Sequence, residues 1–282
     1  MTTTRQLRHQ VNEAVIQALE QGVVPWRSDH GFPRNAFSRR RYGGIEAVSL
    51  MLACQRQGFT SGFWATRDEW EALGGKVEGG PGTQVVVRTG RLFESLRPLT
   101  VYNLCQVAGD FPVSRKERPA VDYALADRIV AGTRADIRFT DKRVAEYHFP
   151  GTDPDGDGDY IKLCRKEQFE RGLGGVNGFY LALFHELAHW TEPGARVGFW
   201  GTTAVNELRA EMASDFLTTE LAIPGCPYAC RSNVHKYRDA WVKEMRCSPR
   251  TIFKVAASAA QAVDYVLGFT AGVEPRHRSV EE

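Results

Sequence analysis

The sequence predicts an α+β protein of two domains, and three observations lead to this prediction. The chain has 282 residues, a length that favours two domains. Its first half combines helical periodicity with two β-branched and aromatic segments between residues 85 and 107. A break at about 109–119 separates this half from a second set of helix and strand patterns. We therefore expect one domain over residues 1–112 and another over 120–282.

The first domain is expected to open with an amphipathic helix. Apolar residues recur at helical spacing from Leu7 to Leu19, and Gly22 follows as a helix terminator. Further helices are expected at 44–57 and 67–73. The segments VVVR and LTVYNL have the composition of strands, and the polar stretch 89–98 between them predicts that they pair.

The second domain is expected to mix helices and strands as well. The acidic run 153–159 resembles a calcium loop, but an EF-hand counted from its first residue needs glutamate at position 12, which is Cys164 here. A hairpin turn is therefore the better interpretation of this run. The other expected elements are a helix at 122–131, strands near 136–139, 144–149 and 160–163, and a long closing helix at 252–269.

The most informative motif is HELAH at residues 185–189, inside the apolar run 178–190. In a helix, His185 and His189 lie one turn apart on one face and can bind one Zn²⁺ at about 2.0–2.1 Å. Glu186 then stands beside the open coordination position, where it can take a proton from activated water. A helix with two surface histidines is the alternative. The apolar surroundings favour burial, which is costly for unpartnered histidines and glutamate.

A second helical segment, NELRAE from Asn206, offers the third ligand. Glu207 and Glu211 lie one turn apart on it. We assign Glu207 to the metal and Glu211 to a hydrogen bond with a ligating imidazole, while the reverse order stays open. An acidic, solvated helix face is the alternative. Two histidines, one carboxylate and one water form a hydrolytic zinc site, and Mn²⁺ or Co²⁺ can use the same ligands.

Charge is distributed unevenly along a chain whose net charge is +2. Residues 1–120 hold 16 Lys and Arg against 11 Asp and Glu, a balance of +5, and the remainder holds 20 against 23, a balance of −3. Arginines and aromatic residues are interleaved in the first half, which is typical of single-stranded nucleic-acid binding. A solvated arginine turn beside an aromatic core is the alternative. The aromatic residues are Trp26, Phe32, Phe37, Tyr42, Phe59, Phe63, Trp64 and Trp70.

The sequence also predicts where the protein is located. No apolar run reaches the roughly 18 residues that a membrane span needs, and the first ten residues lack the apolar core of a signal peptide. The six cysteines are scattered, which favours free thiols over a disulfide framework. We expect a cytoplasmic protein without a membrane partner.

Several spaced motifs in the first half carry a family resemblance. They are LEQG at 19–22, PW at 25–26, PRN at 33–35, YGGI at 42–45, WAT at 64–66, GGKV at 74–77 and VYNLCQV at 101–107. In this order they resemble the single-stranded-DNA-binding domain of ArdC-type antirestriction proteins, which primase-related plasmid proteins share. Together with the charge pattern, this resemblance predicts DNA contacts by Trp26, Arg34, Asn35, Arg39, Arg40, Arg41, Tyr42 and Trp64.

The second half, with HELAHWT, NELRAE and YRDAW at 237–241, is similar to the zincin-like metallopeptidase domain that follows in ArdC proteins. The resemblance spans nearly the whole chain. It implies a metal set of His185, His189 and a glutamate of NELRAE, with Glu186 as the catalytic carboxylate. The segment 192–203 lacks the Thr-Gly and Arg-Leu pairs expected there, so we expect the loop bordering the metal to differ.

The resemblance implies a plasmid- or phage-borne antirestriction protein that binds single-stranded DNA and protects incoming DNA from host restriction. Enzymatic activity is left open. As a zinc peptidase, the protein would cleave a restriction enzyme or another DNA-bound protein, with Glu186 passing a proton from water to the leaving amine. In the alternative, it occludes DNA and the metal is structural. The candidates for stabilising the oxyanion are His148, Tyr228, His235 and Tyr237.

Overall fold

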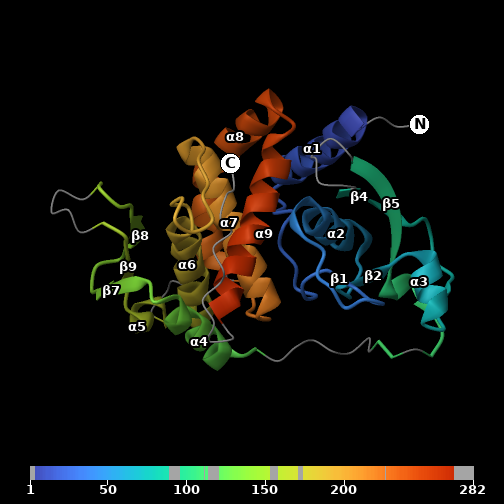
Figure 1. Ribbon diagram of the computed structural model, residues 1–282, viewed down its shortest axis with the longest axis horizontal. Helices are drawn as coiled ribbons and strands as arrows, with labels where there is room; N and C mark the ends of the chain where they lie inside the picture. The colour runs from blue at the N-terminus through green and yellow to red at the C-terminus, as the bar shows by residue number, and fades with distance from the viewer. Residues whose placement is uncertain are drawn as a thin grey trace. The chain divides into compact units, whose positions relative to one another are not determined.

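The computed structural model describes residues 4–88, 96–110, 112–113, 121–152, 158–170, 174–225 and 227–269. Helices and strands are mixed along the chain (Figure 1), which confirms the α+β prediction. The chain divides into two compact units, Met1–Ala120 with Val242–Ala257, and Val121–Trp241 with Ser258–Glu282. The first unit thus includes residues 242–257, which are far from it in the sequence. One contact to this segment is the hydrogen bond that Asn12 Nδ2 donates to Met245 O at 3.2 Å. The domain bounds predicted from the sequence stay a prediction.

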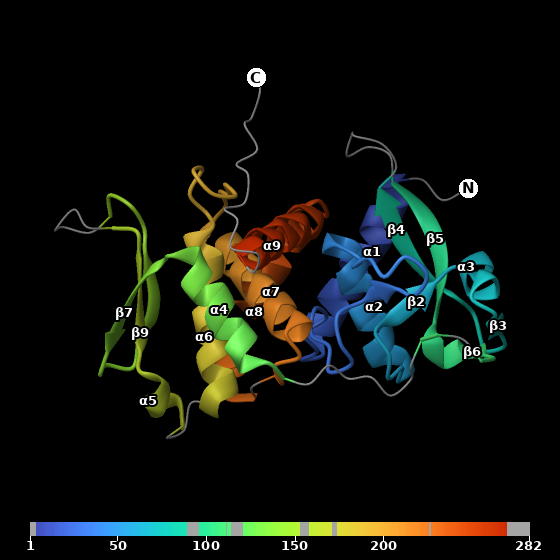
Figure 2. The ribbon, with the colours of Figure 1, turned by 60° about the horizontal axis from the view of Figure 1, so that its bottom comes forward.

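The first unit combines helices with a four-stranded sheet of order β1-β2-β5-β4. The helices are α1 (Thr4–Glu20), α2 (Gly44–Gln57) and α3 (Arg67–Ala72), and the strands are β1 (Arg34–Asn35), β2 (Phe63–Ala65), β4 (Thr83–Arg88) and β5 (Leu96–Asn103). Long strands β4 and β5 form the predicted antiparallel pair (Figure 2), whereas β1 and β2 are parallel. The 3-10 helix η1 (Leu104–Gln106) leads into β6 (Val107–Ala108), which pairs with β3 (Lys76–Val77).

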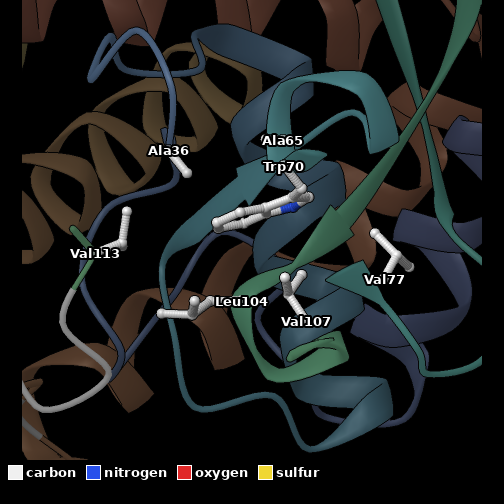
Figure 3. Close-up of a cluster of buried hydrophobic side chains, with 7 residues drawn as sticks. All are labelled: Ala36, Ala65, Trp70, Val77, Leu104, Val107 and Val113. Carbon is white, nitrogen blue, oxygen red and sulfur yellow. The ribbon is translucent and has the colours of Figure 1, made fainter. Parts of the chain in front are cut away.

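Local signals explain where the helices of this unit begin and end. Thr66 caps α3: its hydroxyl accepts from the Glu69 backbone N–H, and the Glu69 carboxylate accepts from the Thr66 N–H. Gly58 ends α2 in the left-handed conformation at φ +67°. Trp70 of α3 is fully buried in a cluster that includes Ala36 and Val107 (Figure 3), and its indole donates to Tyr102 O at 3.0 Å.

The second unit has a three-stranded sheet of order β7-β9-β8, followed by helices. Its elements are α4 (Tyr123–Thr133), β7 (Asp136–Thr140), β8 (Ala145–His148), β9 (Tyr160–Cys164), α5 (Lys166–Glu170), α6 (Gly175–Trp190) and α7 (Thr203–Glu220). Strand β8 is antiparallel to β9, as the hairpin interpretation requires, and the turn residues 153–157 lie outside the described residues. Helices α8 (Pro227–Cys247) and α9 (Thr251–Gly268) complete the chain's described elements.

Two expectations about the chain as a whole can be compared with the structure. Within the described residues, no helix is both long enough and apolar enough to cross a bilayer. Cys54, Cys105, Cys164 and Cys247 are free thiols, as the scattered spacing predicts. The cytoplasmic location stays a prediction.

Candidate metal centre

Helix α6 carries both histidines of the HELAH motif on one face. The helix is buried over most of its length, and His185 and Glu186 are only 7% and 6% exposed. The rings of His185 and His189 lie edge to face with centroids 4.9 Å apart, and their Nε2 atoms are 3.2 Å apart. The i, i+4 spacing therefore directs two imidazole nitrogens at one point, as the sequence predicts.

Helix α7 packs alongside α6 (Figure 1) and contributes the third side chain. Its first turn is capped by Thr202, whose hydroxyl accepts from the Val205 backbone N–H. Glu207 Oε2 lies 3.3 Å from His185 Nε2, and Glu207 Oε1 lies 4.0 Å from His189 Nε2. One ligand atom from each of the three residues lies within 4.8 Å of the other two.

These distances fit a small metal ion. Ligand bonds of about 2.0–2.1 Å at tetrahedral angles place neighbouring ligand atoms about 3.3–3.4 Å apart. The 3.2 Å between the two Nε2 atoms and the 3.3 Å between His185 Nε2 and Glu207 Oε2 match that spacing. The 4.0 Å between Glu207 Oε1 and His189 Nε2 is longer than that spacing.

Each histidine has a further carboxylate on its Nδ1 atom. Glu211 Oε2 lies 3.5 Å from His185 Nδ1, and Glu192 Oε1 lies 2.9 Å from His189 Nδ1. Metal-ligating histidines commonly donate their second N–H to such a partner, which fixes the ring and raises its basicity. The Glu211 position is the one assigned from the sequence. Glu192 is missing from that assignment, because it lies beyond Trp190, the last residue of α6, where the helical period no longer predicts its position.

Arg209 is a buried cation on α7 that contacts the end of α6, and no sequence pattern singled it out. Its side chain has no exposed surface, and it donates to Ala188 O at 2.7 Å, Thr191 Oγ1 at 2.6 Å and Ser258 Oγ at 2.8 Å. Burial lowers the pKa of Arg209 to about 10, and the charge of Glu192 opposes that shift. The guanidinium therefore stays protonated near neutrality and ties α7 to the C-terminal end of α6.

The carboxylates around His185 favour the protonated form of its imidazole. Burial lowers the pKa of His185, but hydrogen bonds to Glu207 and Glu211 outweigh it and hold that pKa well above its ordinary value. Burial raises the pKa of Glu207, whereas the hydrogen bond and charge of His185 bring it below its ordinary value. A bound cation would take the place of this proton, because metal ligands must be deprotonated.

Strand β8 borders the centre beside Glu186. Burial raises the pKa of Glu186, and a backbone hydrogen bond from Tyr147 partly opposes that rise. Tyr147 is held in turn: its hydroxyl donates to Asp159 Oδ1 at 2.8 Å and accepts from Arg196 at 2.9 Å. Arg196 also forms two bonds to the Asp159 carboxylate, at 3.0 and 2.6 Å, and lies 4.3 Å from the Trp190 ring. The loop after α6 is thereby anchored to the sheet.

The structure does not select one of the four residues that were candidates for stabilising the oxyanion. His148 stacks on Tyr160 at 4.2 Å and lies 3.2 Å from the Glu146 carboxylate. His235 is exposed, and the side chain of Tyr228 lies outside the described part of the chain. Tyr237 hydrogen-bonds with Lys236, and the charge of Lys236 contributes to the lowered pKa of Glu207.

The aromatic residues predicted to bind DNA are core residues. Trp26 and Trp64 have no exposed surface, and Tyr42 is 8% exposed. Trp64 and Tyr42 share one hydrophobic cluster. Base stacking needs an open ring face, so the prediction that these three rings stack on DNA is wrong. Aromatic side chains bury more apolar area than any others, and core packing takes precedence here.

Asn35 is also used within the protein. Its Oδ1 accepts from the backbone N–H groups of Phe37 at 3.0 Å and Ser38 at 2.8 Å, and its Nδ2 donates to the Glu69 carboxylate at 3.1 Å. Both ends of the amide are engaged, so Asn35 holds the loop that follows it, and its direct contact with DNA stays a prediction. The four arginines predicted to bind DNA are more accessible: Arg39 and Arg40 are exposed, and Arg34 and Arg41 are half-buried.

Comparisons with known proteins match the two halves of the chain to two different domain families. Residues 5–104 match the N-terminal domain of anti-restriction factor ArdC, and residues 124–258 match a zincin-like metallopeptidase domain. The crystal structure of Mn(II)-bound antirestriction protein ArdC from plasmid R388 superposes with a TM-score of 0.76 at 29% identity, over 95% of this chain and 99% of that one. The chain is therefore of the ArdC type. The metal-free ArdC structure gives a TM-score of 0.74 at 28% identity, over 96% and 99% of the two chains.

Two curated relatives are similar over most of this ArdC-type chain. DNA primase TraC of Escherichia coli is 31% identical over 304 residues, which cover 92% of this chain and only 27% of TraC. Uncharacterized protein y4eC of Sinorhizobium fredii is 25% identical over 300 residues, covering 94% of this chain and 92% of y4eC. The chain thus spans about a quarter of TraC and nearly all of y4eC.

Proposed function

We propose that this chain is an antirestriction protein that binds single-stranded DNA with its first unit and carries a divalent-metal peptidase centre in its second. The ArdC and zincin-like matches support the two roles. The catalytic role rests on one observation, the convergence of His185, His189 and Glu207 beside the buried carboxylate of Glu186. The target would be a host restriction enzyme or another DNA-bound protein.

His185, His189 and Glu207 would hold the metal. Two imidazoles and a carboxylate favour Zn²⁺, and Mn²⁺ or Co²⁺ can use the same donors; the ArdC relative is described with Mn(II). When bound, such an ion supplies Lewis acidity that polarises a carbonyl and acidifies water. Glu192, 2.9 Å from His189 Nδ1, would orient that imidazole, and Glu211 lies 3.5 Å from Nδ1 of His185.

Glu186 would move the proton. Its carboxylate is 6% exposed, and burial raises its pKa, which brings the group closer to the range in which a general base works near neutrality. The Tyr147 backbone N–H orients this carboxylate, and the Arg196–Asp159–Tyr147 bonds hold the strand in place. Glu186 would accept the proton on a carboxylate oxygen and release it to the leaving amine.

The test compares restriction of incoming DNA in cells that produce the wild-type protein or Glu186→Gln, with expression levels matched. Gln keeps the size of the side chain and removes its ability to take a proton. We expect Glu186→Gln to keep its metal, measured on the purified protein, and to lose protection. Glu170→Gln, at an exposed carboxylate at the end of α5, is the matched control and should protect as the wild type does.

An alternative function is DNA occlusion with a structural metal. It is favoured by the exposure of Arg39 and Arg40, which can contact phosphates without any chemistry in the second unit. The same assay separates the two functions. Full protection by Glu186→Gln would overturn the peptidase role and leave DNA binding as the sufficient activity.

A further inference from the structure

The loop between β1 and α2 exposes a phenylalanine at its tip. Phe37 is 54% exposed, whereas its neighbour Ala36 is fully buried and points into the cluster around Trp70 (Figure 3). The chain folds back on itself here, because Asn35 N–H donates to Arg40 O at 2.9 Å and Tyr42 N–H donates to Pro33 O at 2.9 Å. The loop therefore anchors itself through Ala36 and presents Phe37 outward.

The loop is rigid at the position that carries the ring. The Asn35 Oδ1 atom accepts hydrogen bonds from the backbone N–H groups of both Phe37 and Ser38. The Nδ2 atom of the same amide donates to the Glu69 carboxylate. Arg39 adopts the left-handed conformation at φ +61°, and its N–H donates to Asn35 O at 2.8 Å. An exposed ring on a preorganised loop loses little conformational entropy when a ligand stacks on it.

Two guanidinium groups lie over aromatic rings on β2 and β5, the two strands that follow β1 in the order of the sheet. Arg39 Cζ is 5.3 Å from the centroid of Phe63, and Arg67 Cζ is 5.0 Å from the centroid of Tyr102. Phe63 is in β2 and Tyr102 in β5, and both rings are half-buried against the same cluster that receives Ala36. The exposed ring thus shares one end of the unit with two cations held in defined positions.

We propose that Phe37 is the base-stacking residue of the single-strand site, with Arg39 and Arg67 binding the neighbouring phosphates. This inference rests on the proposed DNA-binding function and replaces the buried rings of Trp26, Tyr42 and Trp64. A lone exposed aromatic side chain is ordinary on a protein surface. An exposed ring locked in place beside two oriented guanidinium groups matches the alternation of base and phosphate along a single strand.

The test measures binding of a labelled oligo-dT of about 16 nucleotides by fluorescence anisotropy over a range of salt concentrations. Removal of a stacked ring is worth about 1–3 kcal/mol, so Phe37→Ala should weaken binding about 5- to 140-fold. Its salt dependence should match that of the wild type, because no phosphate contact is lost. Arg67→Ala should reduce the slope of log K against log salt by about 0.7.

Two further variants separate stacking from a structural role. Phe139, 48% exposed on β7 of the second unit, provides the matched control, and Phe139→Ala should bind DNA as the wild type does. Phe37→Trp should keep the affinity and add an indole whose fluorescence is quenched on binding. Wild-type binding with an unaffected Phe37→Ala would overturn this inference alone, and no binding by the folded wild type would overturn the proposed DNA function with it.

Discussion

The two units of this protein place their most informative side chains in opposite environments. In the second unit, the imidazoles and carboxylates of the HELAH and NELRAE segments are buried and face one another. In the first unit, the tryptophans of the recognised motifs are buried, whereas arginines and Phe37 are exposed. A buried polar group requires partners and so indicates a site, but a buried ring requires only packing. The motif residues thus form a cluster of polar side chains in one unit and part of the hydrophobic core in the other.

The largest expected effect tests the core position of the first-unit tryptophans. Trp64→Ala should lower the free energy of unfolding by about 3–5 kcal/mol, because the ring is fully buried among Tyr42 and Val101. Urea denaturation measures the loss. Arg40→Ala, at an exposed position, should change it by about 0.5 kcal/mol or less. If both variants lost similarly little free energy of unfolding, Trp64 would not be a core residue, and the contrast drawn between the two units would fail.

A smaller effect is expected from the carboxylate that supports His189. Glu192→Gln keeps the side-chain shape but removes the charge that accepts from His189 Nδ1 at 2.9 Å. Divalent-metal affinity should fall about 10- to 100-fold, as for other hydrogen-bond partners of metal ligands. Competition with a chromophoric chelator measures it. The exposed Glu170→Gln variant should retain wild-type affinity, and equal affinities in all three proteins would remove Glu192 from the centre.

The smallest effect concerns acid stability at Asp159. Burial raises the pKa of this carboxyl, but hydrogen bonds from Arg196 and Tyr147 outweigh it and lower the pKa below its ordinary value. The stability it contributes is therefore present above the unfolded-state pKa of about 3.9 and is lost as the pH falls through the folded-state value. Its side chain is 39% exposed, so solvent screening limits this contribution to about 1 kcal/mol or less.

The matching experiment compares urea unfolding of the wild type and Asp159→Asn at pH values above and below about 3.9. Asn tolerates the left-handed backbone at φ +88°, so the variant should lose little through the backbone. The difference between the two proteins should shrink as the pH falls. A difference that stays constant with pH would show that the charge of Asp159 plays no part in stability.

The long elements of the fold could be predicted from the sequence, and the short ones could not. The sequence shows clear periodic patterns over helices α2 and α9 and over the β4–β5 pair. Each of these patterns extends over at least ten residues, which is long enough to recognise from sequence alone. Strands β1 and β3 have two residues each, too few for any period. Helix α8 was missed because its composition is polar, and its conformation depends on tertiary packing.

The geometry of the candidate metal centre could be predicted for the same reason, since helical spacing alone brings His185 and His189 together. Glu192 depends on the turn after α6, where Phe199 N–H donates to Glu192 O at 2.9 Å, a contact between residues with no periodic relation. In the first unit, the sequence could indicate aromatic residues but not which of them face solvent. That choice is made by packing between distant strands, as Ala36 and Phe37 illustrate.

The buried guanidinium of Arg209 has a consequence for which ions the centre can hold. It keeps its positive charge near neutrality and its Nη1 lies 3.8 Å from Glu192 Oε1, so it balances the charge of that carboxylate. An ion in the proposed centre would therefore have the charge of Glu207 to balance, but not that of Glu192. Arg209 would thus influence which ions the centre accepts without contacting them.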